Sequence, residues 1–164
     1  MANLISPDEA MFTSFEPKLK MRFIMYIDGI ASFLIKKSPR PSIEASEVIL
    51  DHINVQRYIK GKSKWAMLSG VELYDPIVPS GAQQVMEWIR LGHESVTGRD
   101  GYSDFYKKDI TYNTLGPVGD KVEEWTLKGA WCMKADFGEG DWSSESDPAI
   151  ITLDIRYDFA ILQF

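Results

Sequence analysis

The sequence contains few of the residues that disulfide frameworks and metal sites require. Its 164 residues include one cysteine, Cys132, and two histidines. A single cysteine forms neither an internal disulfide nor a cysteine-based metal site, and two histidines supply a multi-histidine site poorly. Basic residues are also scarce, because 18 Lys and Arg stand against 24 Asp and Glu, for a formal net charge of −6. Lys18, Lys20 and Arg22 form only a short local run, so the basic patch needed for tight binding of duplex DNA is missing.

Long apolar runs are missing as well. No stretch approaches the ~20 apolar residues that span a bilayer, and the N-terminus lacks the basic start and apolar block of a signal peptide. We therefore expect a soluble chain with no membrane insertion. Hydrophobic residues make up 45% and charged residues 26% of the sequence, which is typical of a domain with its own core. Pro7 and Pro17 suggest an N-terminal arm over residues 1–19, followed by a single domain over 20–164.

In much of the chain apolar and polar residues alternate with the period of a β-strand. Residues 20–27 predict a strand, and residues 32–37 predict the second strand of a hairpin after a turn at Asp28-Gly29. Two prolines predict a loop over 37–42. The further segments expected are extended chain over 43–60, polar turns over 60–64 and 116–120, and strands over 65–74, 105–113, 122–135 and 150–161.

One helix is expected over residues 81–91. Ser80 can cap its first turn, Val85 and Trp88 lie on one side, and Gly92 can end it. Two of the strands have a strongly apolar face. These faces consist of Trp125, Leu127, Gly129, Trp131 and Met133, and of Ile151, Leu153, Ile155, Tyr157, Phe159 and Ile161. The predicted fold class is mainly β: an antiparallel β-sandwich or half-barrel with one packed α-helix.

Motifs that could carry catalysis have weak support. Asp136-Phe137-Gly138 matches a kinase tripeptide, but a glycine-rich phosphate loop and a His-Arg-Asp loop are missing. The acidic run from Asp136 to Asp147 lacks the ligand spacing of an EF-hand and is interpreted as a solvated loop. A structural hydrogen bond explains His52, and capping of the helix end explains His93. We expect no enzyme, cofactor or metal, although 24 acids leave open a hydrolase with an unrecognised carboxylate pair.

Several short segments in a fixed order resemble one family. Tyr106-Lys107-Lys108 opens a strand, Leu127-Lys128-Gly129-Ala130-Trp131 resembles a Lys-Gly-x-Trp strand, and Asp141-Trp142-Ser143-Ser144 precedes the last strand. Together with the lone helix bearing Trp88, these segments resemble the tail tube protein of contractile-tailed bacteriophages. The resemblance covers most of the chain, from Pro17 to the C-terminus. Related tubes occur in R-type bacteriocins and type VI secretion systems.

The resemblance implies that copies form a hexameric ring whose sheets join into one continuous β-barrel around a channel. Closure of this kind pairs the strand edges that a single open sheet leaves exposed. Stacked rings would form the inner tube of the contractile tail in the virion, with DNA passing through the channel at ejection. The chain would be made in the host bacterial cytoplasm.

The partners implied are further copies of the chain, the sheath protein, the baseplate tube-initiator and the tail terminator. A tape-measure protein and viral DNA would occupy the lumen without specific binding. Two alternatives stay open. One is the tube of a phage-derived contractile injection or secretion system, and the other is a monomeric β-barrel that binds a small ligand.

Three groups of residues are candidate assembly sites under this interpretation. The first is a ring-stacking loop within 37–62, whose basic residues could meet an acidic neighbouring ring. The second is the exposed side of the helix, which could face the sheath. The third is a pair of acids that could line the lumen. For the first and third groups, plain solvated surface is the alternative. The ring-stacking residues are Pro39, Arg40, Pro41, Arg57, Lys60 and Lys62. The sheath-facing residues are Gln84, Glu87 and Arg90, and the lumen-facing acids are Glu124 and Asp154.

Overall fold

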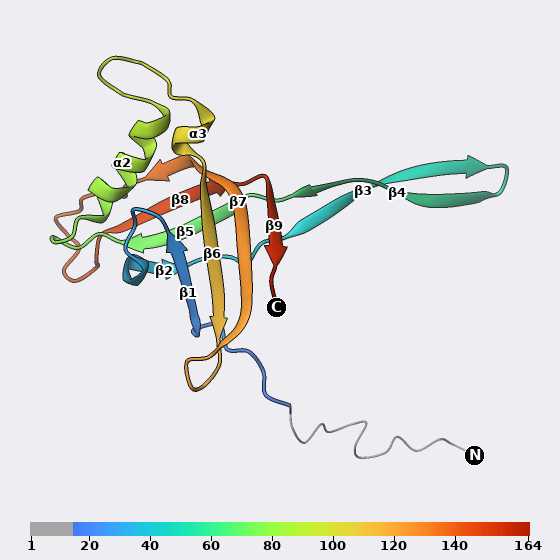
Figure 1. Ribbon diagram of the computed structural model, residues 1–164, viewed down its shortest axis with the longest axis horizontal. Coiled ribbons are helices and arrows are strands. Elements are labelled where there is room, and N and C mark those ends of the chain that lie inside the picture. The colour runs from blue at the N-terminus through green and yellow to red at the C-terminus, as the bar shows by residue number, and fades with distance from the viewer. Residues whose placement is uncertain (1–14) are drawn as a thin grey trace.

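A computed structural model describes residues 15–164 and confirms the expected fold class (Figure 1). One antiparallel sheet, nearly closed into a barrel, has the strand order β1-β6-β7-β8-β5-β2, and β9 also pairs with β7. A separate two-stranded sheet, β3 and β4, extends away from the barrel. The strands are β1 Phe23–Ile27, β2 Ile35–Lys37, β3 Ile43–His52, β4 Val55–Trp65, β5 Leu68–Tyr74, β6 Lys108–Leu115, β7 Lys121–Asp136, β8 Ile150–Arg156 and β9 Phe159–Leu162. The helices are α2 Gly81–Gly92, α3 Ser103–Tyr106 and the 3-10 helix η1 Ser32–Leu34.

β7 is a long strand that belongs to both halves of the sheet. Its first part lies between β6 and β9, and its last part pairs with β8. Gly129, with a φ of 64°, lies between the two parts. Leu127 and Ala130 on either side of it are both buried, so the inward alternation shifts by one residue there. The prediction that one apolar face continues to Met133 is therefore wrong, and Met133 is exposed.

Replacing Gly129 by alanine should destabilise the fold by about 1–2 kcal/mol. The left-handed φ is costly for alanine, and the new Cβ would lie 2.2 Å from Oδ2 of Asp158. Asp158 would have to move, which weakens its 3.0 Å ion pair with Lys107. Denaturant unfolding measures the change. Gly140→Ala is the matched control, because no described atom beyond the chain neighbours lies within 4 Å of that Cβ. Equal stability of the two variants would contradict this account.

The last strand expected from the sequence is in fact two strands, β8 and β9. Along β8 the inward residues are buried as expected. Beyond it, Asp158 donates its N–H to the Lys128 carbonyl at 2.9 Å, while Phe159 is also paired with Lys128. This inserts one residue into the alternation. Ala160 is consequently buried, and the prediction that Phe159 and Ile161 continue the apolar face is wrong because both are exposed.

The expected helix is confirmed as α2. The Ser80 hydroxyl accepts a hydrogen bond from the Gln83 N–H at 3.4 Å and caps the first turn. Val85 and Trp88 are buried in the hydrophobic core. Trp88 Nε1 also donates to the Tyr106 carbonyl at 2.8 Å, which attaches α2 to α3.

Three other expectations are wrong. β1 and β2 do not form a hairpin, because η1 separates them and they pair with β6 and β5 respectively. The polar turn expected over 60–64 is part of β4, and the chain turns at residues 53–54 instead. Gly61 allows this continuation, since a Cβ there would lie 2.5 Å from Oγ of Ser46. Phe105 and Tyr106, expected in a strand, belong to α3.

Within residues 15–164, the structure contains no helix that is both long enough and apolar enough to cross a bilayer. Residues 1–14 of the expected N-terminal arm lie outside the described residues. The single domain over 20–164 stays a prediction.

Candidate functional site

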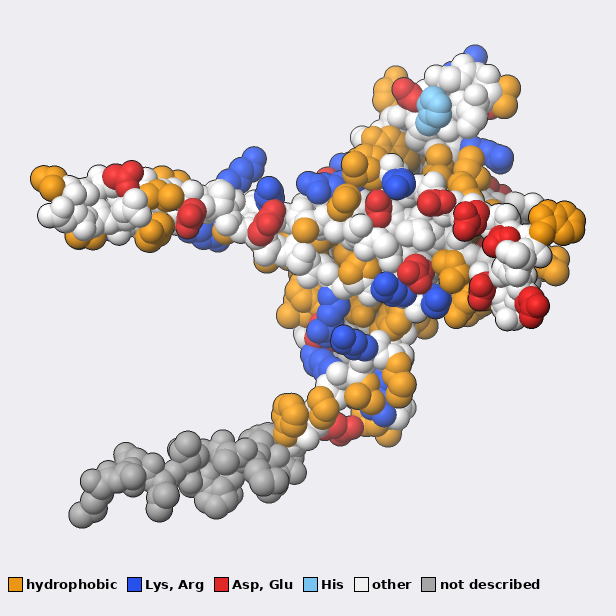
Figure 2. Space-filling view, turned by 180° about the vertical axis from the view of Figure 1, so that it is seen from behind, with side chains coloured by type: hydrophobic (Ala, Val, Ile, Leu, Met, Phe, Trp, Pro, Cys, Tyr) orange, Lys and Arg blue, Asp and Glu red, His pale blue; other side chains and the backbone are white. Residues whose placement is uncertain are grey.

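The β3–β4 hairpin projects far from the barrel (Figures 1 and 2). Every residue of β3 is exposed. The pairing register places Val48, Leu50, Val55 and Ile59 on one face of the ribbon, and all four are exposed. A two-stranded ribbon is marginally stable alone in water, and exposed apolar patches commonly mark interaction surfaces. The exposed apolar face of the hairpin is therefore a candidate interaction surface.

The residues predicted for ring stacking separate into two groups. Arg57, Lys60 and Lys62 lie along β4, on the hairpin itself, and are exposed. Arg40 and its flanking prolines lie before β3, at the root of the hairpin. There Arg40 turns back towards the barrel and contacts β6 and β7.

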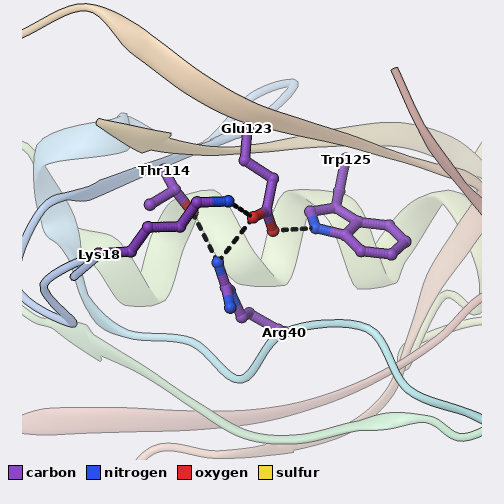
Figure 3. Close-up of polar contacts among 5 residues, drawn as sticks. All are labelled: Lys18, Arg40, Thr114, Glu123 and Trp125. Carbon is purple, nitrogen blue, oxygen red and sulfur yellow. Dashed lines mark hydrogen bonds and ion pairs between the residues drawn. The ribbon is translucent and has the colours of Figure 1, made fainter. Parts of the chain in front are cut away.

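Arg40 belongs to a polar cluster around Glu123 of β7 (Figure 3). The Glu123 carboxylate accepts hydrogen bonds from Arg40 Nη2 at 2.9 Å, from Lys18 Nζ and from Trp125 Nε1. Arg40 also donates to Oγ1 of Thr114 at 3.4 Å. Glu123 is only 8% exposed. One buried carboxylate thus attaches both the N-terminal segment and the hairpin root to the barrel.

These contacts keep Glu123 ionised. Burial alone would raise the pKa of its carboxyl group, but the hydrogen bonds from Lys18 and Trp125 and the charge of Arg40 outweigh burial. The pKa therefore lies below its ordinary value of 4.5. Glu123 was not among the residues predicted from the sequence, although a signal was present. It shares the inward alternation of Trp125 and Leu127, where a carboxylate needs hydrogen-bonding partners.

A cleft of about 590 Å³ lies next to this cluster, in the gap between β1 and β2. Half of its twelve lining residues are basic and none is acidic. The basic ones are Lys18, Lys20, Arg22, Lys36, Lys37 and Arg40. Figure 2 shows Lys and Arg side chains gathered near the start of the described chain. The run at Lys18–Arg22 is therefore half of a larger basic surface that the sequence order conceals.

Negative charge gathers in the loop between β7 and β8. Figure 2 shows acidic side chains at the edge of the barrel opposite the hairpin. Trp142 in this loop is fully exposed. In the described part of the chain, no three His, Cys, Asp or Glu residues are grouped so that they could hold a metal ion. We use the name acidic loop for Trp142 together with five acids. They are Asp136, the last residue of β7, and Glu139, Asp141, Glu145 and Asp147 in the loop.

The predicted sheath-facing residues are not equally exposed. Glu87 and Arg90 are exposed on the outer side of α2. Gln84 is half-buried, and its Oε1 accepts the Ala31 N–H at 3.0 Å, so it holds the helix against the segment before η1. The outer face of α2 is therefore narrower than the sequence suggested.

The two acids predicted for the lumen lie on different parts of the sheet. Glu124 of β7 is on the face opposite the core and pairs with Lys121 at 3.0 Å. Asp154 of β8 accepts hydrogen bonds from the Gly70 N–H at 3.1 Å and the Ser69 hydroxyl at 3.2 Å, and so stabilises β5. The structure does not bring these two carboxylates together.

One part of the sheet ends in a free strand on both sides. The strands β1, β6, β7 and β9 lie side by side. Among the described residues, β1 pairs only with β6 apart from a bridge between Ile27 and Ile30, and β9 pairs only with β7. Both outer edges therefore offer unpaired backbone N–H and C=O groups.

No protein-family model matches the chain, and no curated protein matches it. Solved structures do. One match is a chain from the sheath/tube terminator of an extracellular contractile injection system, PVC. The aligned region covers 92% of this chain and 99% of the PVC chain, with 18% identity and a TM-score of 0.73. A chain from the baseplate of the anti-feeding prophage covers 90% and 96%, with 15% identity and a TM-score of 0.68. A chain from the PVC sheath–tube complex covers 98% and 99%, with 16% identity and a TM-score of 0.66. The predicted resemblance to contractile tube proteins is thus confirmed at the level of the fold.

Proposed function

We propose that this chain is a structural subunit of the tube of a contractile injection apparatus, with copies closing into rings that stack inside a sheath. The fold shared with chains of a sheath/tube terminator and a sheath–tube complex supports a tube-like structural role. The observation that carries the proposal is the four-stranded segment β1-β6-β7-β9 with its two free edges. A sheet with two free edges can continue into an identical neighbour on each side, which produces closed rings.

Strand pairing alone does not stabilise such a ring. About five hydrogen bonds between β1 of one copy and β9 of the next contribute ~5 kcal/mol. Association costs ~4–15 kcal/mol in lost translational and rotational freedom. Apolar burial must supply the remainder. The apolar face of the hairpin is the natural source, because it is exposed in the single copy.

Ring closure through these edges fixes which face lines the channel. The core and the strands β8, β5 and β2 lie on one side of the four-stranded segment. Six copies can close only with this bulk outside, so the opposite face points inward. Glu124 lies on that face, as does the ion pair between Asp109 and Lys128 at 2.6 Å. Asp154 lies on β8, outside this wall. A wall without surplus cations does not hold a polyanion, so cargo can slide.

Partners follow from the same arrangement. Homohexameric rings are supported by the six-fold symmetrised baseplate that contains one of the similar chains. A sheath protein would contact Glu87 and Arg90 on α2, and initiator and terminator proteins would bind the two ends of the tube. The compared structures are contractile injection systems, so an injection apparatus has closer support than a phage virion. Placement in a virion tail with DNA ejection, and a tape-measure protein in the lumen, stay predictions.

A monomeric ligand-binding barrel has less support. Met25, Leu73, Leu127 and Leu153 fill the interior and have no exposed surface. The basic cleft lies at the gap between β1 and β2 rather than inside this core. The similar structures are tube and terminator assemblies, which also favours a structural role over an enzymatic one.

Electron microscopy and sedimentation of the purified full-length chain test the proposal. We expect rings or hollow tubes whose abundance rises with protein concentration. A uniform monomer at every concentration up to the solubility limit would overturn it.

A further inference from the structure

We propose that the acidic loop of one copy binds the basic strand β4 of the hairpin from a second copy. This inference rests on the proposed function, because it requires copies of the chain to assemble. It identifies the surface that the hairpin contacts. Arg57, Lys60 and Lys62 of one copy bind Trp142 and the acids of the acidic loop on the next copy.

Strand β4 of the hairpin offers positive charge that the barrel does not neutralise. β4 carries four Lys or Arg residues and no acid. Lys64, near the barrel, pairs with Glu44 across the hairpin at 3.2 Å. Arg57, Lys60 and Lys62 form no ion pair with any residue of the described range 15–164. The same ribbon carries exposed aliphatic side chains, so it can make both charged and apolar contacts.

The loop offers the complementary chemistry in a preformed shape. Its five acids span residues 136–147 without a single Lys or Arg. Asp141 accepts hydrogen bonds from the hydroxyl of Ser143 at 2.7 Å and from its N–H at 2.9 Å, and Ser144 donates to Asp147 at 3.0 Å. Trp142 stands fully exposed among these charges. Such a side chain contributes strongly to an interface once an aliphatic surface covers it.

The two surfaces lie at opposite ends of one copy, so they can meet only between copies. The hairpin leads into β5 at Leu68, whereas the acidic loop leads into β8 at Ile150. Ile150 is paired with Tyr74, at the far end of β5. Figures 1 and 2 show the hairpin and the acidic edge on opposite sides of the barrel. A contact between two different surfaces of identical chains is head-to-tail, which is the kind that builds rings and filaments.

Reciprocal charge reversal tests the contact. Lys60→Glu/Lys62→Glu changes the hairpin, and Glu139→Lys/Glu145→Lys changes the loop. All four side chains are exposed, so thermal melting should show each variant folded. We expect each double variant to raise the concentration needed for assembly at least ~10-fold, because like charges would face one another. Arg99→Glu, between α2 and α3, and Asp104→Lys, in α3, change exposed residues; they are the control reversals and should assemble normally.

Combining the reversed hairpin with the reversed loop gives the decisive readout. The quadruple variant should assemble again, because its reversed hairpin meets a reversed loop. An equimolar mixture of the two double variants should also assemble, since each variant then finds its complement in the other. Normal assembly of both double variants, or failure of both recombined samples, would overturn the contact but leave the tube proposal standing. A wild-type chain that never assembles would overturn the tube proposal itself and this contact with it.

The basic cleft between β1 and β2 is the competing acceptor for the acidic loop. If reversal at Lys20 and Lys37, which line the cleft, rescues the loop variant while reversal on the hairpin does not, the assignment to β4 is wrong.

Trp142 provides an independent readout that does not depend on charge. Trp142→Ala should melt like the wild type yet assemble more weakly, and Trp142→Phe should restore most of the assembly. Unchanged assembly of Trp142→Ala would contradict the apolar part of the contact.

Discussion

Replacing Leu162 by proline should leave the subunit folded and prevent ring closure. Leu162 lies in β9, one of the two free edges of the four-stranded segment. The Gln163 N–H donates to the Glu124 carbonyl of β7 at 2.8 Å. N–H directions alternate along a strand, so the Leu162 N–H points away from β7, towards the free edge. Proline is tolerated at such an edge position of a single chain.

In the assembled ring the same substitution should be severe. It removes a donor from the seam between copies and places a pyrrolidine ring where the neighbouring strand would lie. A loss of about 2 kcal/mol at each seam corresponds to roughly 30-fold weaker pairing, and the effect repeats at every seam of a ring. We therefore expect no rings by electron microscopy at concentrations where the wild type is fully assembled.

The control for this variant is Leu162→Ala, which truncates the same half-exposed side chain but keeps the N–H. It should assemble nearly as well as the wild type. If the proline variant forms normal rings, β9 is not at the seam. If it fails to fold, as judged by circular dichroism, the inferred direction of the Leu162 N–H is wrong.

Local patterns predicted the strands and the helix well because each depends on neighbouring residues. The cap at Ser80 and the buried stripe of Val85 and Trp88 define α2 without reference to the rest of the chain. Pairing was harder to predict. A short polar link between two strands usually closes a hairpin. Here η1 separates β1 from β2, and they pair with β6 and β5 respectively. The shifts at Gly129 and Asp158 were also hidden, since each depends on how β7 is shared between β8 and β9.

The candidate assembly residues likewise divide into those that a local pattern predicts and those that depend on distant partners. Arg57, Lys60 and Lys62 could be chosen from the sequence because an exposed basic strand needs no partner to be recognised. Arg40 looked equivalent to them, but its role is decided by Glu123, which lies 83 positions later. Long-range ion pairs of this kind are invisible to periodicity. The basic cleft was missed for the same reason, because β1 and β2 approach each other only in the folded barrel.

Replacing Glu123 by glutamine should cost about 2 kcal/mol of stability at pH 7. Removing one partner of a buried ion pair typically costs 3–5 kcal/mol. The Lys18 and Arg40 side chains remain 46% and 48% exposed, so they can return to water and the cost is smaller. Glu124→Gln is the matched control, because its ion pair with Lys121 is between more exposed residues three positions apart and should matter by less than ~1 kcal/mol.

The pH dependence distinguishes loss of charge from loss of packing. Because the folded-state pKa of Glu123 lies below 4.5, its carboxylate stabilises the fold above that pH, and this stabilisation disappears as the pH falls through the folded-state pKa. The wild type and Glu123→Gln should therefore differ at pH 7 and converge in stability below pH 4.5. A constant difference across this range would mean that the loss of stability does not come from the charge of the Glu123 carboxylate. The hairpin root should respond as well: with Arg40 released, trypsin should cleave after Lys37, next to the root, faster in Glu123→Gln than in Glu124→Gln, because Glu123, unlike Glu124, binds Arg40.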